Sequence, residues 1–188
     1  MSNYCTYNSK LLDGVKHIHF IGCGGSGMFP LIQILHARGY EISGSDVEET
    51  KITASEQAMG ITVRFGHDAA NIAGADLIVY SAAIHEDNCE IRAARAHGTP
   101  MAERSELLGY VSRLYSQSVC VSGTHGKTTT TSMIATMLEL AGRDPAAVIG
   151  GKLPLIGGYG KAGGGGSIVI DACEYRETFL QLTPFLGV

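Results

Sequence analysis

Residues 123–130 read Gly-Thr-His-Gly-Lys-Thr-Thr-Thr, a combination of residue types that can hold the terminal phosphates of a nucleotide. Glycines let backbone N–H groups face phosphate oxygens, and the N-terminus of a following helix adds positive potential. A lysine in the place of Lys127 reaches the β- and γ-phosphates, and the hydroxyl of Thr128 can bind Mg²⁺. The usual pattern has a further glycine five residues before Gly126, where this chain has Val121. We expect a nucleotide phosphate site made by Gly123, Thr124, His125, Gly126, Lys127, Thr128 and Thr129.

A second glycine loop, residues 22–27, reads Gly-Cys-Gly-Gly-Ser-Gly between an expected strand and an expected helix. Asp46 lies at the end of the next expected strand, at the separation that suits a carboxylate accepting from a ribose hydroxyl. This pattern is typical of NAD-binding proteins, but its physical content is a backbone cradle for a diphosphate beside a ribose, which a UDP-sugar also contains. The pattern therefore indicates a diphosphate site and leaves the ligand open.

The residues before position 115 alternate strand-like and helix-like patterns. Apolar runs at residues 17–21, 41–45, 61–65, 76–81 and 99–102 predict strands, and residues 28–35, 52–59, 88–97 and 106–114 predict helices. Strands separated by helices imply right-handed βαβ units and a parallel sheet. We predict a Rossmann-like α/β domain over residues 1–115.

Residues 116–188 begin a second α/β unit with the strand that leads into the phosphate loop. Further strands are expected near residues 147–151 and 168–170, and the glycine-rich residues 157–166 are expected to form a flexible loop. The strand-like segments are too few to close an α/β sheet, so we expect an incomplete, truncated P-loop ATPase domain here.

Composition excludes several classes of function. The formal net charge of −4 argues against a nucleic-acid or anionic-membrane partner. The first sixteen residues lack the apolar core of a signal peptide, and no apolar run approaches the ~20 residues of a membrane span. The five cysteines are scattered without metal-ligand spacing, which fits reduced thiols. We expect a cytoplasmic protein; its oligomeric state is open.

The two glycine loops in this order resemble the Mur ligases of peptidoglycan synthesis, and the resemblance runs over nearly the whole chain. Supporting segments are residues 43–46 (Ser-Gly-Ser-Asp), 65–67 (Phe-Gly-His), 81–84 (Ser-Ala-Ala-Ile), 87–88 (Asp-Asn) and 148–152 (Val-Ile-Gly-Gly-Lys). In that family the first domain binds a UDP-sugar, the second is an ATPase, and a third completes the amino-acid and ATP sites. The resemblance implies an ATP- and Mg²⁺-dependent ligase that joins an amino acid, here L-alanine, to UDP-N-acetylmuramate through an acyl phosphate.

The resemblance also implies roles for individual residues. Lys127, Thr128 and Glu174 would be catalytic, with Thr128 and Glu174 holding Mg²⁺. Reasoning from the strand at residues 168–170 alone selects Asp171 as the metal ligand, as in a Walker-B strand; we favour Glu174. The aspartates that flank the acid in the family are absent, because residues 172–176 read Ala-Cys-Glu-Tyr-Arg. The expected UDP-sugar contacts are Gly22, Gly24, Gly25, Ser26, Gly27, Asp46, His67, Ser81 and Arg104.

Two other functions stay open at this point. One is a UDP-sugar-binding module without turnover, which suits a chain lacking the family's third domain; we expect this chain to bind ligand without making product. The other is an NAD(P)-dependent oxidoreductase, which is less favoured because it leaves Gly126, Lys127 and Thr128 without a role. His17 and His19 share a strand face without a third ligand nearby, and we expect them to be structural.

Overall fold

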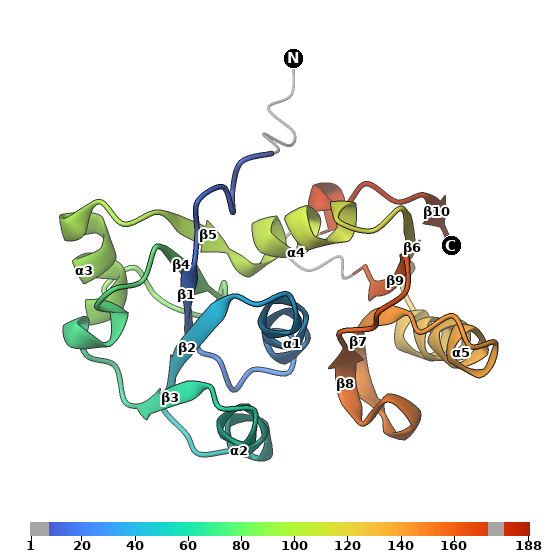
Figure 1. Cartoon of the computed structure of the whole chain (residues 1–188), viewed down its shortest axis with the longest axis horizontal. Helices are drawn as coiled ribbons and strands as arrows, with labels where there is room; N and C mark the ends of the chain where they lie inside the picture. Colours follow the sequence, from blue (N-terminus) through green and yellow to red (C-terminus); the bar gives the residue numbers. More distant parts are fainter. Residues whose placement is uncertain (1–7, 173–178) are drawn as a thin grey trace. The chain divides into compact units, whose positions relative to one another are not determined.

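The computed structural model describes residues 8–172 and 179–188. The chain folds into two compact units (Figure 1). Residues 12–104 form the first, and residues 105–188 together with the segment before Leu12 form the second. This division falls at the start of a helix, eleven residues before the junction expected from the sequence, and the functional domain boundary at 115/116 stays a prediction. None of the helices in the described ranges is long and apolar enough to cross a membrane.

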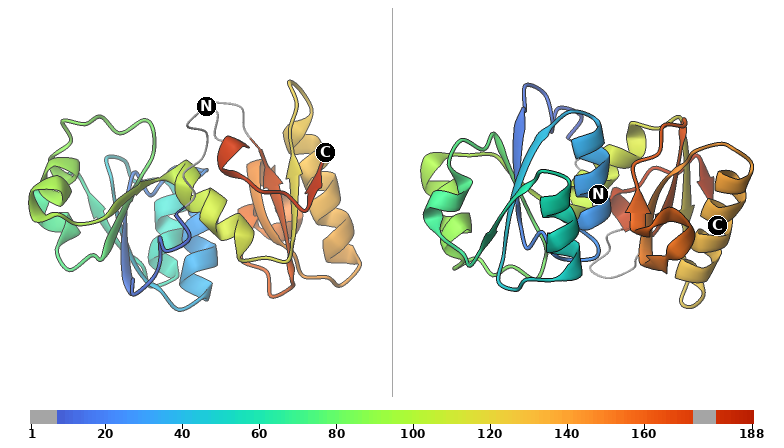
Figure 2. Two further views of the ribbon diagram at one scale, coloured as in Figure 1. Left: turned by 90° about the horizontal axis from the view of Figure 1, so that it is seen from above. Right: turned by 60° about the horizontal axis from the view of Figure 1, so that its bottom comes forward.

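The first unit is built on a five-stranded parallel sheet with the strand order β3-β2-β1-β4-β5. Helices α1 and α2 lie on one face of this sheet and α3 lies on the other (Figures 1 and 2). The elements are β1 (His17–Ile21), α1 (Phe29–Ala37), β2 (Glu41–Asp46), α2 (Lys51–Ala58), β3 (Thr62–Phe65), η1 (Ala69–Ile72), β4 (Leu77–Tyr80), α3 (Cys89–His97) and β5 (Met101–Glu103). The expected Rossmann-like parallel sheet is confirmed in its sheet topology.

The order of this sheet determines where a ligand can bind. β1 pairs with β2 on one side and with β4 on the other, so the chain changes direction across the sheet at β1. In open parallel sheets such a switch point leaves a crevice at the carboxyl ends of the strands. The apolar residues of β1 fill the core below that edge, since Ile18, Phe20 and Ile21 are fully buried. The loop that follows β1 therefore begins at a strand that is packed in the core.

The second unit has a mixed sheet with the order β10-β6-β9-β7-β8, and α5 packs against β6, β7 and β9. Its elements are α4 (Arg104–Arg113), whose first residue closes the first unit, β6 (Gln117–Val121), α5 (Lys127–Leu140), β7 (Ala146–Leu153), η2 (Pro154–Ile156), β8 (Gly158–Lys161), β9 (Ser167–Asp171) and β10 (Leu186–Gly187). Every pairing is parallel except that of β7 with β8.

Two predictions for this unit are wrong. The glycine-rich residues 157–166 are not simply a loop, because β8 lies within them and pairs antiparallel with β7. The unit also has more strands than expected, since the short β10 adds to β6 through parallel pairing. Both strands were missed because β8 reads Gly-Tyr-Gly-Lys and β10 has two residues, so neither shows an alternating apolar pattern.

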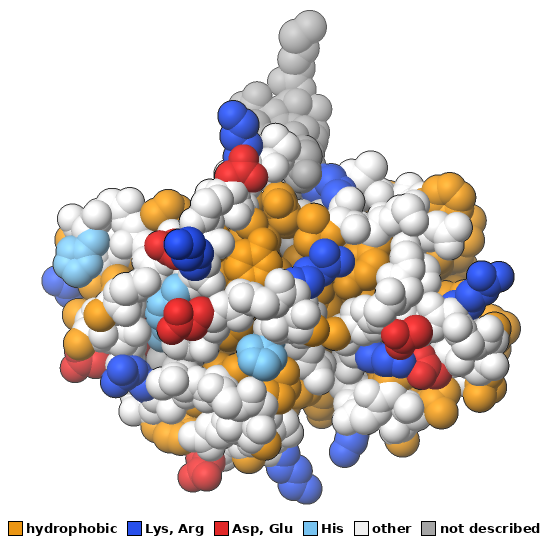
Figure 3. All heavy atoms as spheres, in the orientation of Figure 1, with side chains coloured by type: hydrophobic (Ala, Val, Ile, Leu, Met, Phe, Trp, Pro, Cys, Tyr) orange, Lys and Arg blue, Asp and Glu red, His pale blue; other side chains and the backbone are white. Residues whose placement is uncertain are grey.

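Charged side chains on the face drawn in Figure 3 are interspersed, with basic and acidic groups near one another.

Candidate functional sites at two glycine loops

The first glycine loop is fixed to the neighbouring strand by backbone hydrogen bonds. β1 ends at Ile21, and the amides of Gly22 and Cys23 both donate to the carbonyl of Ser45, over 2.8 and 3.1 Å. Gly22 has φ +78°, a left-handed conformation that glycine adopts at little cost. The chain therefore turns sharply off the end of β1, and Gly25 and Ser26 are exposed at the tip of the turn.

Asp46, the last residue of β2, is brought directly to this loop. Its Oδ2 accepts a hydrogen bond from the Gly24 amide over 2.8 Å, and its Oδ1 accepts from the Glu48 amide over 3.2 Å. A Cβ atom at Gly24 would lie 2.9 Å from Asp46 Oδ2 and 2.9 Å from Thr53 Cγ2. Position 24 therefore requires glycine if Asp46 is to stay in contact with the loop.

Two further predicted residues, Ser81 and Arg104, lie beside the same loop. A Cβ placed on Gly27 would be 3.5 Å from Nη1 of Arg104, so the guanidinium reaches the end of the loop. A Cβ on Gly22 would be 3.9 Å from Oγ of Ser81, the residue that follows β4. Arg104 is the cation closest to the loop among these predicted residues, and a guanidinium there suits a diphosphate.

His67, two residues after β3, lies at the same edge of the sheet but makes different contacts. Its Nδ1 is 3.3 Å from Oε1 of Glu90 and 3.4 Å from Oγ of Ser45. Glu90 belongs to the first turn of α3, and its side chain is fully buried, whereas that of His67 is 20 % exposed. Sequence reasoning missed Glu90, because an acid in the first turn of a helix is so common that no motif marks it.

The buried groups beneath the loop include a thiol and a second carboxyl group. Burial raises the pKa of the Cys23 thiol, so this residue is a neutral thiol at neutral pH. Glu56 of α2 is also fully buried, and its carboxyl group has the Cys23 thiol as a neighbour, which partly opposes the effect of burial on its pKa. Burial raises the pKa of Glu56 to about 7, and the negative charge of Asp46 adds to this effect.

The second glycine loop joins β6 to the 14-residue helix α5. Gly123 and Gly126 have φ of +140° and +80°, and α5 begins at Lys127 directly after Gly126. The residues between them are exposed, and Nζ of Lys127 donates to the carbonyl of Gly123 over 2.7 Å. The lysine is thus folded over its own loop, at the positive end of the helix dipole, where a phosphate group would be bound. Thr128 and Thr129 also border a surface groove of about 490 Å³ that runs along α5.

Asp171, the last residue of β9, is paired with the hydroxyl of Thr128. Thr128 Oγ1 donates to Asp171 Oδ2 over 2.6 Å, and the Gly150 amide donates to the same oxygen over 3.3 Å. The other oxygen, Oδ1, is buried and has no hydrogen-bond partner among the described residues. A Cβ on Gly150 would lie 2.6 Å from Asp171 Oδ2 and 3.1 Å from Thr128 Oγ1, so glycine is needed there too.

The pair of Thr128 and Asp171 fits a magnesium ion. Mg²⁺ prefers hard oxygen ligands and commonly takes one or two carboxylates together with phosphate oxygens and water. No cluster of three or more metal-binding side chains occurs within residues 8–172 and 179–188, so the remaining ligands would come from phosphate and water. Glu174, the ligand favoured from the sequence, lies outside the described residues.

Comparison with known proteins gives consistent matches. The sequence profile described as "Mur ligase family, catalytic domain" matches residues 17–116. UDP-N-acetylmuramate–L-alanine ligase of Agathobacter rectalis is 50 % identical over 169 residues, covering 89 % of this chain and 37 % of the relative. The enzyme of the same name from Alkaliphilus metalliredigens is 43 % identical over 174 residues, covering 93 % and 38 %. This chain thus spans 37–38 % of the length of these two relatives.

Solved structures give the same result. The crystal structure of UDP-N-acetylmuramate–alanine ligase from Thermotoga maritima superposes with a TM-score of 0.85 at 32 % identity, covering 91 % of this chain and 40 % of that one. A UDP-N-acetylmuramate:L-alanyl-γ-D-glutamyl-meso-diaminopimelate ligase from Neisseria meningitidis gives 0.81 at 30 % identity, covering 92 % and 59 %.

Proposed function

We propose that this chain, which belongs to the Mur ligase family, is the N-terminal part of a UDP-N-acetylmuramate–L-alanine ligase. In this proposal the first unit binds the UDP-sugar and the second binds ATP and Mg²⁺. The identity of 43–50 % to UDP-N-acetylmuramate–L-alanine ligases supports the choice of ligase, and the observation that carries the ATP and Mg²⁺ site is the 2.6 Å hydrogen bond between Thr128 and Asp171 beside Lys127. It places a hydroxyl, a carboxylate and a cation together at the start of one helix, which is what a nucleotide phosphate with its metal ion requires.

The reaction implied by the relatives' names is amide formation. A carboxylate resists attack by an amine, so the muramyl carboxylate is first phosphorylated by ATP, and the amine of L-alanine then displaces phosphate from the acyl phosphate. A bound Mg²⁺ would neutralise charge on the transferring phosphoryl group. The residues of this chain would position the substrates and neutralise charge on the phosphates. Lys127 would hold the β- and γ-phosphates, the amides of the loop would cradle oxygens, and Thr128 with Asp171 or Glu174 would hold the metal.

In the first unit, the residues around the Gly22–Gly27 loop would bind the UDP moiety. The carboxylate of Asp46 would accept from a ribose hydroxyl, and the guanidinium of Arg104 would face the diphosphate, with Ser81 beside it. The contacts of Asp46 with Gly24 and of Arg104 with Gly27 support this assignment, since both side chains already lie against the loop. Gly25 and Ser26 are exposed at its tip and are free to approach a ligand.

The test measures binding of UDP-N-acetylmuramate, ATP with Mg²⁺, and NAD to the 188-residue chain by calorimetry. We expect UDP-N-acetylmuramate to bind and the Gly24→Val variant to lose that binding, because the new side chain would meet Asp46 and Thr53 and project toward the diphosphate. Gly187→Ala is the matched control, since a Cβ there meets nothing within 4 Å.

Three outcomes separate the alternatives. Unchanged affinity in Gly24→Val would remove the loop from the UDP-sugar site. Binding of NAD in preference to UDP-N-acetylmuramate would favour the oxidoreductase. The expectation that this chain binds without turnover is checked by phosphate release, which should be absent when ATP, UDP-N-acetylmuramate and L-alanine are all supplied.

A further inference from the structure

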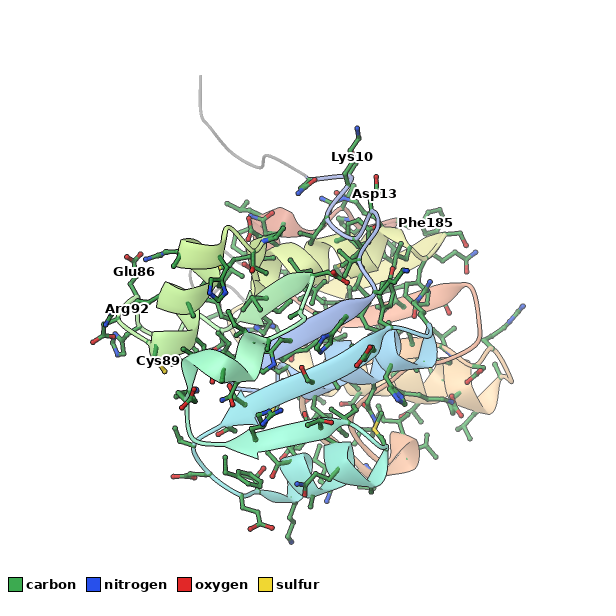
Figure 4. All side chains as sticks on the ribbon, turned by 60° about the vertical axis from the view of Figure 1, so that its left-hand side comes forward. Lys10, Asp13, Glu86, Cys89, Arg92 and Phe185 are labelled. Atoms are coloured by element: carbon green, nitrogen blue, oxygen red, sulfur yellow. The ribbon has the colours of Figure 1, made fainter. Side chains whose placement is uncertain are left out.

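A single carboxylate, that of Glu90, gathers hydrogen-bond donors from five residues of the first unit. Oε2 accepts from Ser45 Oγ over 2.7 Å and lies 3.3 Å from Nε2 of His19. Oε1 accepts from Asn71 Nδ2 over 2.7 Å and from the Asp68 amide over 3.3 Å, and it lies 3.3 Å from Nδ1 of His67. Arg92, on the same helix, extends away from the sheet (Figure 4), whereas the Glu90 side chain is fully buried against it.

Glu90 is ionised and can only accept hydrogen bonds. Burial by itself would raise its pKa, but the hydrogen bonds from His19, Ser45 and Asn71 outweigh burial and lower the pKa to about 2. An ionised carboxylate has four lone-pair sites and no hydrogen to give. Every neighbouring group that bonds to it must therefore donate.

This requirement determines which nitrogen of the His67 ring carries the hydrogen. The single hydroxyl hydrogen of Ser45 is directed at Glu90 Oε2, so Ser45 Oγ can act toward His67 only as an acceptor. Nδ1 of His67 faces two acceptors, Glu90 Oε1 and Ser45 Oγ, and must itself carry the hydrogen. In the neutral ring, Nε2 then holds a lone pair, and it has no partner among the described residues.

The His67 ring lies at the edge of the sheet where we expect the nucleotide to bind. The amide of Gly66, the preceding residue, donates to the carbonyl of Asp46 over 2.8 Å, so the segment that carries His67 is fixed beside the acid at the glycine loop. Both segments follow carboxyl ends of adjacent parallel strands, β2 and β3, the edge at which open α/β sheets bind ligands.

We propose that Glu90 is a positioning residue that holds His67 with Nδ1–H directed inward and the Nε2 lone pair directed outward, as an acceptor for a hydrogen-bond donor of the uridine moiety. The inference rests on the proposed function, because it assumes that the ligand of the first unit is a uridine diphosphate. Uridine offers two kinds of donor: the imide N3–H of the base and the ribose hydroxyls. An outward acceptor selects for a nucleoside that carries such a donor.

The first test reads the ring directly in the unliganded wild-type chain. Long-range ¹H–¹⁵N correlation spectra distinguish a protonated ring nitrogen from one with a lone pair, and loss of the signals in His67→Asn assigns them among the seven histidines. We expect neutral His67 to carry its hydrogen on Nδ1. A predominant Nε2–H form would overturn the proposal.

The second test measures the affinity of UDP for two variants of His67. Asn can keep an inward donor in the place of Nδ1 but has no outward acceptor, and we expect a loss of affinity of about three- to tenfold, the usual worth of one hydrogen bond. Gln places an amide oxygen near the position of Nε2 and should restore affinity to within about threefold of wild type. Wild-type affinity in His67→Asn would overturn the proposal.

Analogues of UDP identify the donor. N3-methyl-UDP lacks the imide N–H, and 2′-deoxy-UDP lacks one ribose hydroxyl. The wild-type chain should discriminate against the analogue that lacks the donor, and His67→Asn should lose that discrimination. 3′-Deoxy-UDP tests the other ribose hydroxyl in the same way. If none of the three penalties changes in His67→Asn, the ring accepts from none of these groups and the proposal is wrong.

Glu90→Gln tests the positioning role. A neutral amide is a weaker acceptor, so we expect a smaller fraction of the Nδ1–H form of His67 together with weaker UDP binding. An unchanged ring and unchanged affinity in folded Glu90→Gln would overturn this role; if the variant does not fold, the wild-type spectrum and the His67 variants decide. Failure of wild-type chain to bind UDP at all would instead count against the proposed function, since the ring measurement does not depend on ligand.

Discussion

The two glycine loops of this chain have the same construction but different chemistry. Each leaves the end of one strand, and in each case an acid is the last residue of the adjacent parallel strand: Asp46 ends β2 beside β1, and Asp171 ends β9 beside β6. At the first loop the acid accepts from the backbone amide of Gly24. At the second it accepts from the side-chain hydroxyl of Thr128.

The difference lies in what the following helix contributes. Helix α5 begins with Lys127 and Thr128, so a cation and a hydroxyl lie at the loop itself. Helix α1 begins with Phe29 and Pro30, which are buried, and the nearby cation is Arg104 from a distant part of the sequence. The glycines shape both loops, and in the proposed function the first residues of the helix distinguish a site for a metal-bound triphosphate from one for a diphosphate joined to a sugar.

The largest effect that separates the two loops is expected from Lys127→Ala. Removing the ammonium group from the proposed phosphate site should weaken binding of ATP with Mg²⁺ by about 100-fold, since hydrogen bonds to charged groups are worth about 1.5–3 kcal/mol. Calorimetry should show unchanged binding of UDP-N-acetylmuramate by the same variant. Arg143→Ala, which removes an exposed cation beyond the other end of α5, is the control. Equal losses for both ligands would contradict two independent loops.

A smaller effect, about tenfold, is expected from Asp171→Asn, because a neutral amide is a poorer Mg²⁺ ligand than a carboxylate. The loss should appear in the Mg²⁺-dependent part of ATP binding and should leave UDP-N-acetylmuramate unaffected. Asp46→Asn is the equivalent change at the first loop. It should weaken binding of UDP-N-acetylmuramate and leave the Mg²⁺-dependent binding of ATP unchanged. If Glu174→Gln removes the Mg²⁺ dependence while Asp171→Asn preserves it, Asp171 serves only to orient Thr128.

The sequence was sufficient to predict the strands and α-helices of the first unit, although not η1, and the positions of both glycine loops between a strand and a helix. Strand β1 was predicted at its observed bounds, because a buried strand flanked by a glycine turn has a clear apolar pattern. The contact of Thr128 with Asp171 could have been predicted from the sequence, because Asp171 directly follows a predicted strand and was already considered as a metal ligand. The choice of Glu174 over Asp171 as metal ligand stays a prediction.

Interactions that depend on the tertiary fold were beyond the sequence. Glu90 meets His19 and His67 only after α3 has packed on the sheet, across separations of 71 and 23 residues. The need for glycine at a position that contacts a distant side chain could not be predicted either, because only the fold shows that Gly150 makes room for Asp171. The expected structural role of His17 and His19 stays a prediction, although both rings contact Ser43 Oγ, at 2.7 and 2.9 Å.

The smallest effect on ligand binding is expected from Glu56→Gln beneath the first loop, which should instead change stability. Because the pKa of folded Glu56 is raised from 4.5 to about 7, the folded state retains a proton that the unfolded state has lost. The free energy of unfolding should therefore decrease as pH rises from about 4.5 to about 7, by at most about 3 kcal/mol. Urea titrations across this range should show the decrease in wild type and a flatter profile in Glu56→Gln. The exposed variant Glu49→Gln should keep the wild-type slope, and an identical slope in Glu56→Gln would contradict the prediction.

The hydrogen bonds of Glu90 also bear on how the first unit opens. If α3 were to separate from the sheet while the strands stayed in place, Ser45 and Asn71 would exchange a hydrogen bond to a charged carboxylate for one to water, and hydrogen bonds to charged groups are worth about 1.5–3 kcal/mol each. Local detachment of α3 is therefore costly compared with a helix held by apolar contacts alone. We therefore expect opening of α3 to be coupled to opening of β1, β2 and the segment after β3. Hydrogen exchange at the amides of α3 should then follow that of the strands that it covers.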